Sequence, residues 1–148
     1  MKLSIFDFDG TITSHDSFID FIFYSHGPIK SLLGILFLSP VLILYFIKIL
    51  PNWKTKEIVF SYFFKGWKEN NFKKTASKYS TQQLPKILKK NALERIVFHQ
   101  KSGDKVLICT ASFECYLKNW CQNEGCDLIG TKIEFKDGLL TGKFSSKK

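Results

Sequence analysis

Two aspartates separated by one residue, Asp7 and Asp9, end the first apolar segment of the chain, within IFDFDGTITSHDS at residues 5–17. Residues 2–8 predict a short strand, in which an aspartate is an unusual residue. An ordinary turn after a capped strand explains Asp9 and Gly10, because Asp-Gly is a common turn pair. The alternative is acid–base or metal chemistry, since two carboxylates this close resist ionising together unless a cation lies between them.

The composition is that of a globular protein with one domain, or one domain and a small insertion. The chain has 148 residues, of which 45% are hydrophobic and 24% are charged. Its net charge of +9, from 22 Lys and Arg against 13 Asp and Glu, favours phosphorylated metabolites and anionic lipid surfaces as partners. The lysine pairs at 73–74, 89–90 and 147–148 are scattered and accompany no nucleic-acid-binding module, so we expect no nucleic acid partner.

The cysteines and the first residues predict a cytoplasmic protein. No CxxC pair and no zinc-finger spacing is present, so the cysteines are interpreted as packing residues in a reducing compartment. They are Cys109, Cys115, Cys121 and Cys126. Charged residues interrupt the first ten positions, which argues against a signal peptide.

The middle of the chain has helical patterns. A helix is predicted over residues 18–24, ending at Gly27 and Pro28. Residues 31–50 are apolar almost all round, and residues 51–101 show apolar residues at helical intervals between lysine-rich faces. Several amphipathic helices are therefore expected after the apolar segment.

The last third of the chain predicts strands again. The continuous apolar run at residues 106–109 predicts a strand that is buried on both faces, as in parallel sheets covered by helices. A helix is expected over residues 113–123, with Gly125 ending it. Asp137 and Gly138 stand between two short apolar runs and predict a β-hairpin.

In this order, the motifs resemble the haloacid dehalogenase superfamily of phosphotransferases, in its phosphoserine-phosphatase-like branch, subfamily IB. The first motif of that superfamily, DxDGT at the end of the first strand, is present as Asp7, Asp9, Gly10 and Thr11. The second motif, a buried strand ending in Ser or Thr, is present as VLICT with Thr110.

The resemblance implies an α/β fold, with a Rossmann-like parallel sheet as the core and an inserted α-helical cap. The core is assigned to residues 1–14 and 100–148, and the cap to residues 15–99 with its apolar segment at 31–50.

The resemblance also implies roles for the motif residues. Asp7 is the expected nucleophile that forms an aspartyl-phosphate, and Asp9 is the expected general acid and base. Mg²⁺ is the implied cofactor, bound by the Asp7 side chain and the Asp9 backbone carbonyl. Thr110 and the Ala111 amide are expected to bind the phosphoryl group, with Ser112 as a weaker candidate. The histidines His15, His26 and His99 match no motif.

The apolar segment at 31–50 is long enough for one membrane span, which takes about 20 residues. A single crossing is excluded because Asp7 and Thr110 must belong to one sheet on one side of the membrane. Pro40 predicts two helices of roughly 13 Å each, which dip into one leaflet. Positive charge flanks them at both ends, from Lys30 and from the cluster of Lys48, Lys54 and Lys56. The alternative is a pair of helices buried in the cap or against a partner chain.

The layout of this segment resembles bacterial phosphatidylglycerophosphate phosphatases of the haloacid dehalogenase type, the phosphatidylglycerophosphatase C type. We therefore expect a lipid phosphate as substrate and a location at the inner face of the cell membrane. Two alternatives are a soluble phosphoserine-phosphatase-like enzyme for small metabolites and an inactive, truncated membrane-binding protein. A homo-oligomer is kept as a further alternative for the partner of the chain.

Two later motifs of the superfamily have no match in the chain. The third motif is a lysine, and Lys147 and Lys148 follow the hairpin too closely to provide it. The fourth is an acidic pair at a strand end, which Asp104, Asp127 and Asp137 do not match. The prediction is a truncated or interrupted family member with an uncovered apolar sheet edge and little turnover by itself.

Overall fold

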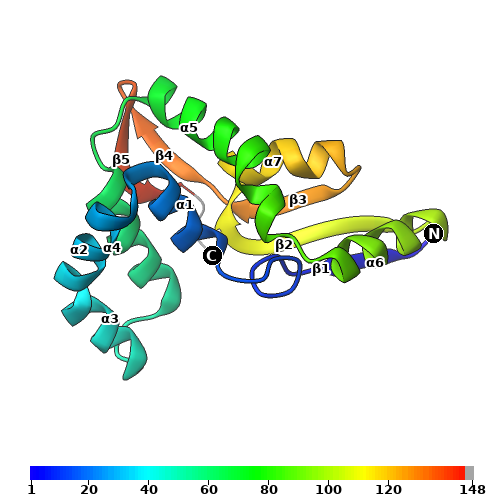
Figure 1. Ribbon diagram of the computed structural model, residues 1–148, viewed down its shortest axis with the longest axis horizontal. Coiled ribbons are helices and arrows are strands. Elements are labelled where there is room, and N and C mark those ends of the chain that lie inside the picture. Colours follow the sequence, from blue (N-terminus) through cyan, green and yellow to red (C-terminus); the bar gives the residue numbers. More distant parts are fainter. Residues whose placement is uncertain (146–148) are drawn as a thin grey trace.

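A computed structural model describes residues 1–145 and contains a parallel three-stranded sheet (Figure 1). Strands β1 (Leu3–Phe6), β2 (Lys105–Phe113) and β3 (Asp127–Thr131) lie in the order β1-β2-β3, with Phe6 opposite Ile108. The predicted α/β fold class with a parallel sheet is confirmed. The register places the carboxyl ends of β1 and β2 at one edge, where the two motifs meet.

Within residues 1–145, helices cover one face of this sheet and leave the other open. Helices α6 (Lys90–Lys101) and α7 (Glu114–Asn123) pack on the face that carries the buried side chains of Val106 and Ile108. The opposite face carries exposed apolar side chains, and no helix of residues 1–145 covers it. These side chains are Leu3 at 56%, Ile5 at 61% and Ile129 at 56% exposure, and Cys109 is exposed beside them.

The prediction that residues 106–109 are buried on both faces is therefore wrong. Side chains alternate between the two faces of a strand, so a one-sided cover leaves every second residue in solvent. The packing role expected for the cysteines holds for Cys121 and Cys126, which are buried, but not for Cys109.

Five helices and a 3₁₀ turn form the segment between β1 and α6. They are α1 (Ser17–His26), α2 (Pro28–Phe37), α3 (Ser39–Phe46), α4 (Asn52–Phe64), α5 (Glu69–Gln82) and η1 (Leu84–Ile87). The expected division of the apolar segment into two short helices is confirmed, but the break lies at Leu38 and not at Pro40. Pro40 lies in the first turn of α3, where its missing N–H breaks no helical hydrogen bond.

Aromatic side chains join these helices to the rest of the molecule. Phe21 of α1 is fully buried, and its ring centre lies 5.3 Å from that of Phe64 in α4. The rings of Tyr79 in α5 and Tyr116 in α7 each lie 5.1 Å from Phe21. The first turns of α1 and the faces of α4, α5 and α7 therefore share one core, which fixes the start of α1 relative to the sheet.

The predicted hairpin is present as β4 (Ile133–Lys136) and β5 (Leu139–Phe144). Asp137 and Gly138 both have positive φ, at 52° and 74°, as two-residue hairpin turns require. The Gly66 amide donates to the Leu140 carbonyl at 2.9 Å, so the connection between α4 and α5 is attached to this hairpin.

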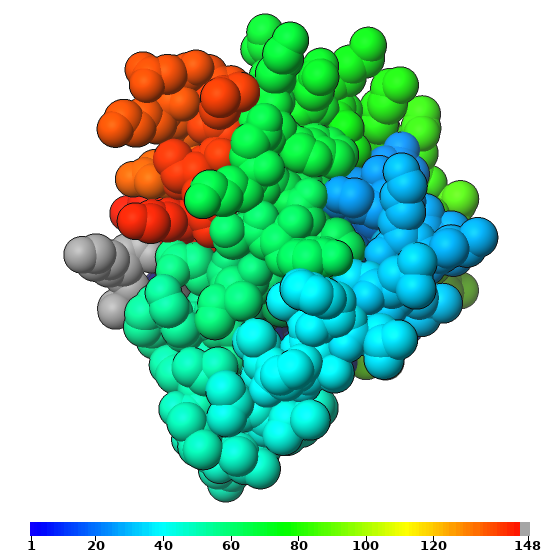
Figure 2. Space-filling model, turned by 90° about the vertical axis from the view of Figure 1, so that its left-hand side faces the viewer, coloured from blue at the N-terminus to red at the C-terminus, as the bar shows by residue number. Residues whose placement is uncertain are grey.

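The helix pair α2–α3 lies at the surface of the molecule (Figure 2), and many of its apolar side chains are exposed. We call this the α2–α3 apolar surface, and it consists of Ile29, Leu32, Leu33, Leu36, Phe37, Ile43, Phe46 and Ile47. Gly34 packs α2 against α4 so closely that a Cβ there would lie 2.5 Å from the Phe63 ring. Across residues 1–145, no helix by itself has the length and apolarity of a membrane span, and α2 and α3 reach them only as a pair bent by 61°.

Candidate active site

Asp7 and Thr110 lie at the carboxyl edge of neighbouring strands. Asp7 directly follows β1, is exposed, and accepts a hydrogen bond from the Phe8 amide at 2.8 Å. Thr110 is 5% exposed, and its hydroxyl oxygen accepts from the Ser112 amide at 3.0 Å. Strand β2 continues to Phe113 instead of ending at Thr110, but its pairing with β1 stops at Ile108. Thr110 therefore stands where the sheet opens.

The loop after Asp7 is closed by hydrogen bonds to a single carbonyl. The Phe8 oxygen accepts from the amides of Ile12 at 2.9 Å and Thr13 at 3.1 Å. Gly10 has a φ of 75°, which glycine adopts without steric cost, and its amide donates to the Thr13 hydroxyl at 3.1 Å. This tight loop sets the direction in which Asp9 leaves the strand.

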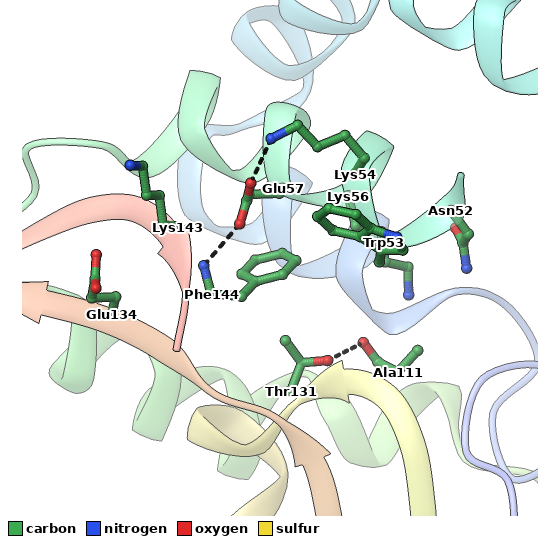
Figure 3. Close-up of a pocket in the computed structure, with 10 residues that line it drawn as sticks. All are labelled: Asn52, Trp53, Lys54, Lys56, Glu57, Ala111, Thr131, Glu134, Lys143 and Phe144. Atoms are coloured by element: carbon green, nitrogen blue, oxygen red, sulfur yellow. Dashed lines mark hydrogen bonds and ion pairs between the residues drawn. The ribbon is translucent and has the colours of Figure 1, made fainter. Parts of the chain in front are cut away.

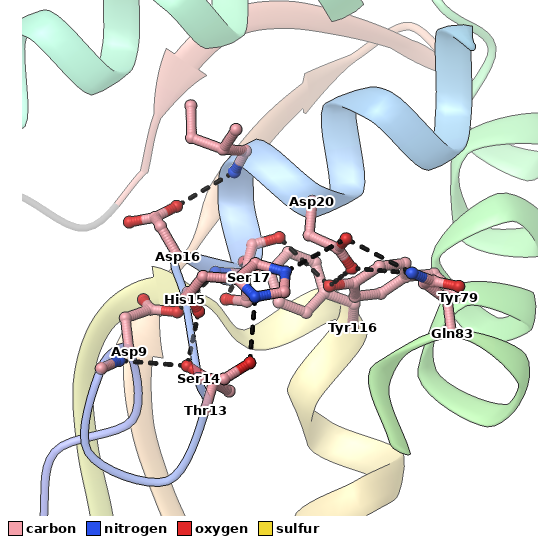
Figure 4. A network of polar contacts seen from close by, with 12 residues as sticks. Asp9, Thr13, Ser14, His15, Asp16, Ser17, Asp20, Tyr79, Gln83 and Tyr116 are labelled. Atoms are coloured by element: carbon pink, nitrogen blue, oxygen red, sulfur yellow. Dashed lines mark hydrogen bonds and ion pairs between the residues drawn. The ribbon is translucent and has the colours of Figure 1, made fainter. Parts of the chain in front are cut away.

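Both carboxylate oxygens of Asp9 are held by hydrogen bonds, and Figure 4 shows Asp9 beside Ser17, one of its two partners. Oδ1 accepts from the Ser17 amide at the start of α1, at 2.7 Å. Oδ2 accepts from the Ser112 hydroxyl, which follows Thr110 in β2. The carboxylate is thereby oriented by one residue of the helical segment and one of the sheet.

Two buried tyrosines extend this network into the helices. The Ser17 hydroxyl shares hydrogen bonds with Ser112 at 3.2 Å and with the Tyr116 hydroxyl at 2.9 Å. Tyr79 donates to Asp20 at 2.9 Å (Figure 4). Burial, and then the charge of Asp9, raise the pKa of Tyr116 well above its ordinary value, and burial also raises the pKa of Tyr79. Both tyrosines therefore stay protonated at physiological pH.

The residues expected to bind Mg²⁺ offer oxygen ligands of the right kind. Asp7 Oδ2 and the Asp9 carbonyl oxygen accept no hydrogen bond within residues 1–145. No group of three or more His, Cys, Asp or Glu side chains in the same part of the chain could hold a metal ion. Mg²⁺ commonly takes one or two protein oxygens and completes its shell with water and phosphate, so the donor set fits this ion.

Two further residues were expected to bind the phosphoryl group, Ala111 and Ser112, and both follow Thr110 in β2. Ala111 follows Thr110, and its carbonyl accepts from the Thr131 hydroxyl at 2.9 Å. Ser112, the weaker candidate, makes the direct contact with Asp9. The ammonium group of Lys89 donates to the Gly10 carbonyl at 2.7 Å, a contact with the aspartate loop that no sequence pattern predicted.

The other sequence candidates make structural contacts. His26 bonds the Phe63 carbonyl at 2.9 Å, His99 contacts Asp104 at 2.9 Å, and His15 lies 3.4 Å from Asp20. Asp127 pairs with Lys105 at 2.9 Å, and Asp137 lies in the hairpin turn. Lys147 and Lys148 lie outside the described residues.

A cleft of about 760 Å³ lies beside this edge, between α4 and the strands (Figure 3). Ala111 and Thr131 line its floor, while Trp53, Lys56 and Glu57 come from α4. Glu134, Lys143 and Phe144 line it from the hairpin, and Asn52 and Lys54 complete the lining. The sequence pattern pointed to Lys54 and Lys56 as cations that follow the apolar segment, but it did not point to Lys143.

The structure is thus an α/β protein with an aspartate pair in a tight loop at the edge of its parallel sheet and with helices inserted after the first strand, as the motifs predicted. The chain belongs to the haloacid dehalogenase-like hydrolase family, whose model matches residues 5–148. The resemblance stated from the motifs is confirmed at the level of the superfamily, and phosphoserine phosphatases are among the solved structures with a similar fold.

The chain is similar to protein CicA of Caulobacter vibrioides, with 32% identity over 142 residues, covering 95% of this chain and 63% of that protein. A Bordetella pertussis protein of unknown function has a similar fold, with a TM-score of 0.79, 19% identity, and coverage of 97% of this chain and 66% of the other. A phosphoserine phosphatase solved as a phospho-aspartyl intermediate analogue also has a similar fold, with a TM-score of 0.65 and 21% identity. The match covers 97% of this chain and 62% of that phosphatase. The chain thus spans less than two thirds of the length of these relatives.

Proposed function

We propose that this chain carries the nucleophile of a Mg²⁺-dependent phosphomonoester hydrolase and that the reaction proceeds through an aspartyl-phosphate. The observation that carries the proposal is the exposed Asp7 carboxylate next to an Asp9 whose two oxygens are both held. The similar phosphoserine phosphatase, solved as a phospho-aspartyl intermediate analogue, supports this chemistry.

The two carboxyl groups divide the work between them. A carboxylate oxygen of Asp7 forms a bond to phosphorus as the bond between phosphorus and the substrate alcohol breaks. Asp9 in its acid form gives its proton to the departing alcohol and then takes one from the water that attacks the phosphorylated Asp7. Phosphate and free Asp7 result, and the Thr110 hydroxyl hydrogen is available to a phosphoryl oxygen. Bound Mg²⁺ would offset the negative charge of Asp7 and the phosphoryl group.

Phosphate release from p-nitrophenyl phosphate, with Mg²⁺ or with EDTA, tests this proposal. We expect little turnover from residues 1–148 alone, and measurable turnover after a segment carrying a third-motif lysine and a fourth-motif acidic pair is added. Asp7→Asn should abolish that turnover, because an amide is not a nucleophile here. Absence of Asp7-dependent release with and without the added segment would refute the proposed activity, and robust release from the chain alone would refute the need for that segment.

We also propose that the substrate is a lipid phosphate and that the α2–α3 apolar surface binds the inner, anionic face of the cell membrane. Phe37 and Phe46 are 71% and 74% exposed, and they belong to a group of exposed apolar side chains instead of standing singly on the surface. Lys30 and Lys48 lie within the pair and at its end, and the chain carries a net charge of +9. Apolar insertion combined with attraction of lysines to anionic lipid is the pattern of interfacial helices.

Vesicle sedimentation separates this proposal from a soluble phosphoserine-phosphatase-like enzyme. Leu33→Ser, Phe37→Ser and Phe46→Ser together should release the protein from phosphatidylglycerol vesicles. The matched control is Val97→Ser with Phe98→Ser, two exposed apolar residues of α6. Binding should weaken with salt without disappearing. Equal binding by both variants, or no binding by the wild type, would count against the membrane site.

A further inference from the structure

The cleft reaches the candidate active site at Ala111, one of the residues expected to bind the reacting phosphate. Ala111, the residue after Thr110, lines its floor. Its volume of about 760 Å³ lies within the range of sites that bind small ligands, roughly 300–1,000 Å³. A phosphomonoester bound at Thr110 would therefore extend the rest of its structure into this space.

The acidic and the basic side chains that line the cleft differ in whether they have partners (Figure 3). Glu57 receives a hydrogen bond from Lys54 at 3.0 Å and from the Phe144 amide at 3.1 Å. Glu134 accepts from the Thr141 hydroxyl at 2.7 Å. Both acids thus have partners, while two cations of the lining are left without an ion pair among residues 1–145.

These two cations are Lys56 of α4 and Lys143 of β5. They come from different elements and line the same cleft, so a ligand between α4 and the hairpin can meet both. The first turn of α4 has no acidic residue and no side-chain cap, which adds to the positive potential at this end of the cleft.

We propose that Lys56 and Lys143 bind a second anionic group of the substrate, away from the phosphate that reacts. This inference rests on the proposed function and names the substrate class: a phosphomonoester that carries another phosphate or a carboxylate. An amphiphilic substrate would suit this site, because the cleft adjoins the α2–α3 apolar surface. Asn52 belongs both to this cleft and to a shallow depression formed with Tyr45 and Phe46, at the end of the α2–α3 apolar surface.

Titration calorimetry and Trp53 fluorescence on the 148-residue chain test the proposal without requiring turnover. The soluble probes are propane-1,3-diol bisphosphate and, as its matched control, the monophosphate. The lipid probe is a phosphatidylcholine vesicle with phosphatidylinositol 4-phosphate, which also carries two phosphate groups. Trp53→Phe identifies the part of the fluorescence signal that comes from the cleft.

Lys56→Ala and Lys143→Ala should each weaken binding of the bisphosphate about tenfold and change binding of the monophosphate by less than about twofold. Lys56→Arg should keep most of the affinity. The control is Lys101→Ala, an exposed lysine of α6 at the other end of the molecule (Figure 1), which should bind as the wild type does.

Lysine-dependent binding of either the soluble bisphosphate or the lipid probe supports the site and identifies the source of the second phosphate. Binding of neither, or equal losses for bisphosphate and monophosphate, would overturn it. Failure of the proposed function is distinguishable, because the chain would then bind the bisphosphate through both lysines and still release no phosphate after the added segment is supplied.

Discussion

Removal of the Ser112 hydroxyl tests how Asp9 is held. Ser112 is fully buried, and its hydroxyl donates to Asp9 Oδ2 and contacts the Ser17 hydroxyl at 3.2 Å. Ser112→Ala leaves almost no cavity, so the loss of a hydrogen bond to a charged group should dominate, at about 1.5–3 kcal/mol of unfolding free energy. Since each kcal/mol moves Tm by about 2–4 °C in a chain of this size, Tm should fall by about 3–12 °C.

Thermal and guanidinium unfolding measure this change. Ser102→Ala is the matched control, because its hydroxyl is exposed and donates only to the Phe98 carbonyl, and it should cost less than about 0.5 kcal/mol. In an Asp9→Asn background the cost of Ser112→Ala should shrink to about 0.5–1.5 kcal/mol, because the acceptor is then neutral. If Ser112→Ala unfolds like Ser102→Ala, or costs the same in both backgrounds, the contact does not hold the carboxylate and our account of the site is wrong.

The remaining predictions concern charge and exposure. Asp7→Asn should unfold like the wild type, within about 0.5 kcal/mol, since Asp7 is exposed and its one hydrogen bond is local, and a large loss of stability would contradict this placement. Burial raises the pKa of Glu57, but the hydrogen bonds from Lys54 and the Phe144 amide and the charges of Lys54 and Lys143 outweigh it and leave that pKa below its ordinary value. The ionised Glu57 therefore stabilises the fold at neutral pH, and the advantage of the wild type over Glu57→Gln should vanish as pH falls through that lowered pKa, measured by unfolding from pH 7 to pH 2. Cys109 should react quickly with a thiol reagent at pH 8 while Cys121 reacts slowly, because burial raises the pKa of Cys121 to about 12. A slow Cys109 in a sample that sediments as a dimer would show that a second copy covers the open sheet face.

Several local features could be predicted from the sequence because neighbouring residues create them. The turn at Asp137 and Gly138 depends on two adjacent positive φ angles, which these residue types tolerate. The break between α2 and α3 depends on a proline that can only begin a helix, so its position was predicted to within two residues, at Leu38 instead of Pro40. The DxDGT loop is also local, since the Phe8 carbonyl closes it within five residues, at Thr13.

Exposure of the sheet could not be predicted in the same way. An apolar run such as residues 106–109 shows that a strand is apolar, but not whether a second layer exists to cover it. The structure decides this, with Ile108 buried and Cys109 exposed in the same strand.

The family motifs, the two carboxylates and the apolar helix pair could be recognised before folding is considered, because each pattern lies within a short stretch of chain. The surroundings of these groups depend on tertiary packing. Asp9 is held by Ser17, eight positions away, and by Ser112, 103 positions away. The cleft likewise joins Glu57 to Phe144 across 87 positions. Partners at such separations meet only after the helices pack on the sheet, and no local pattern records which side chains that packing brings together.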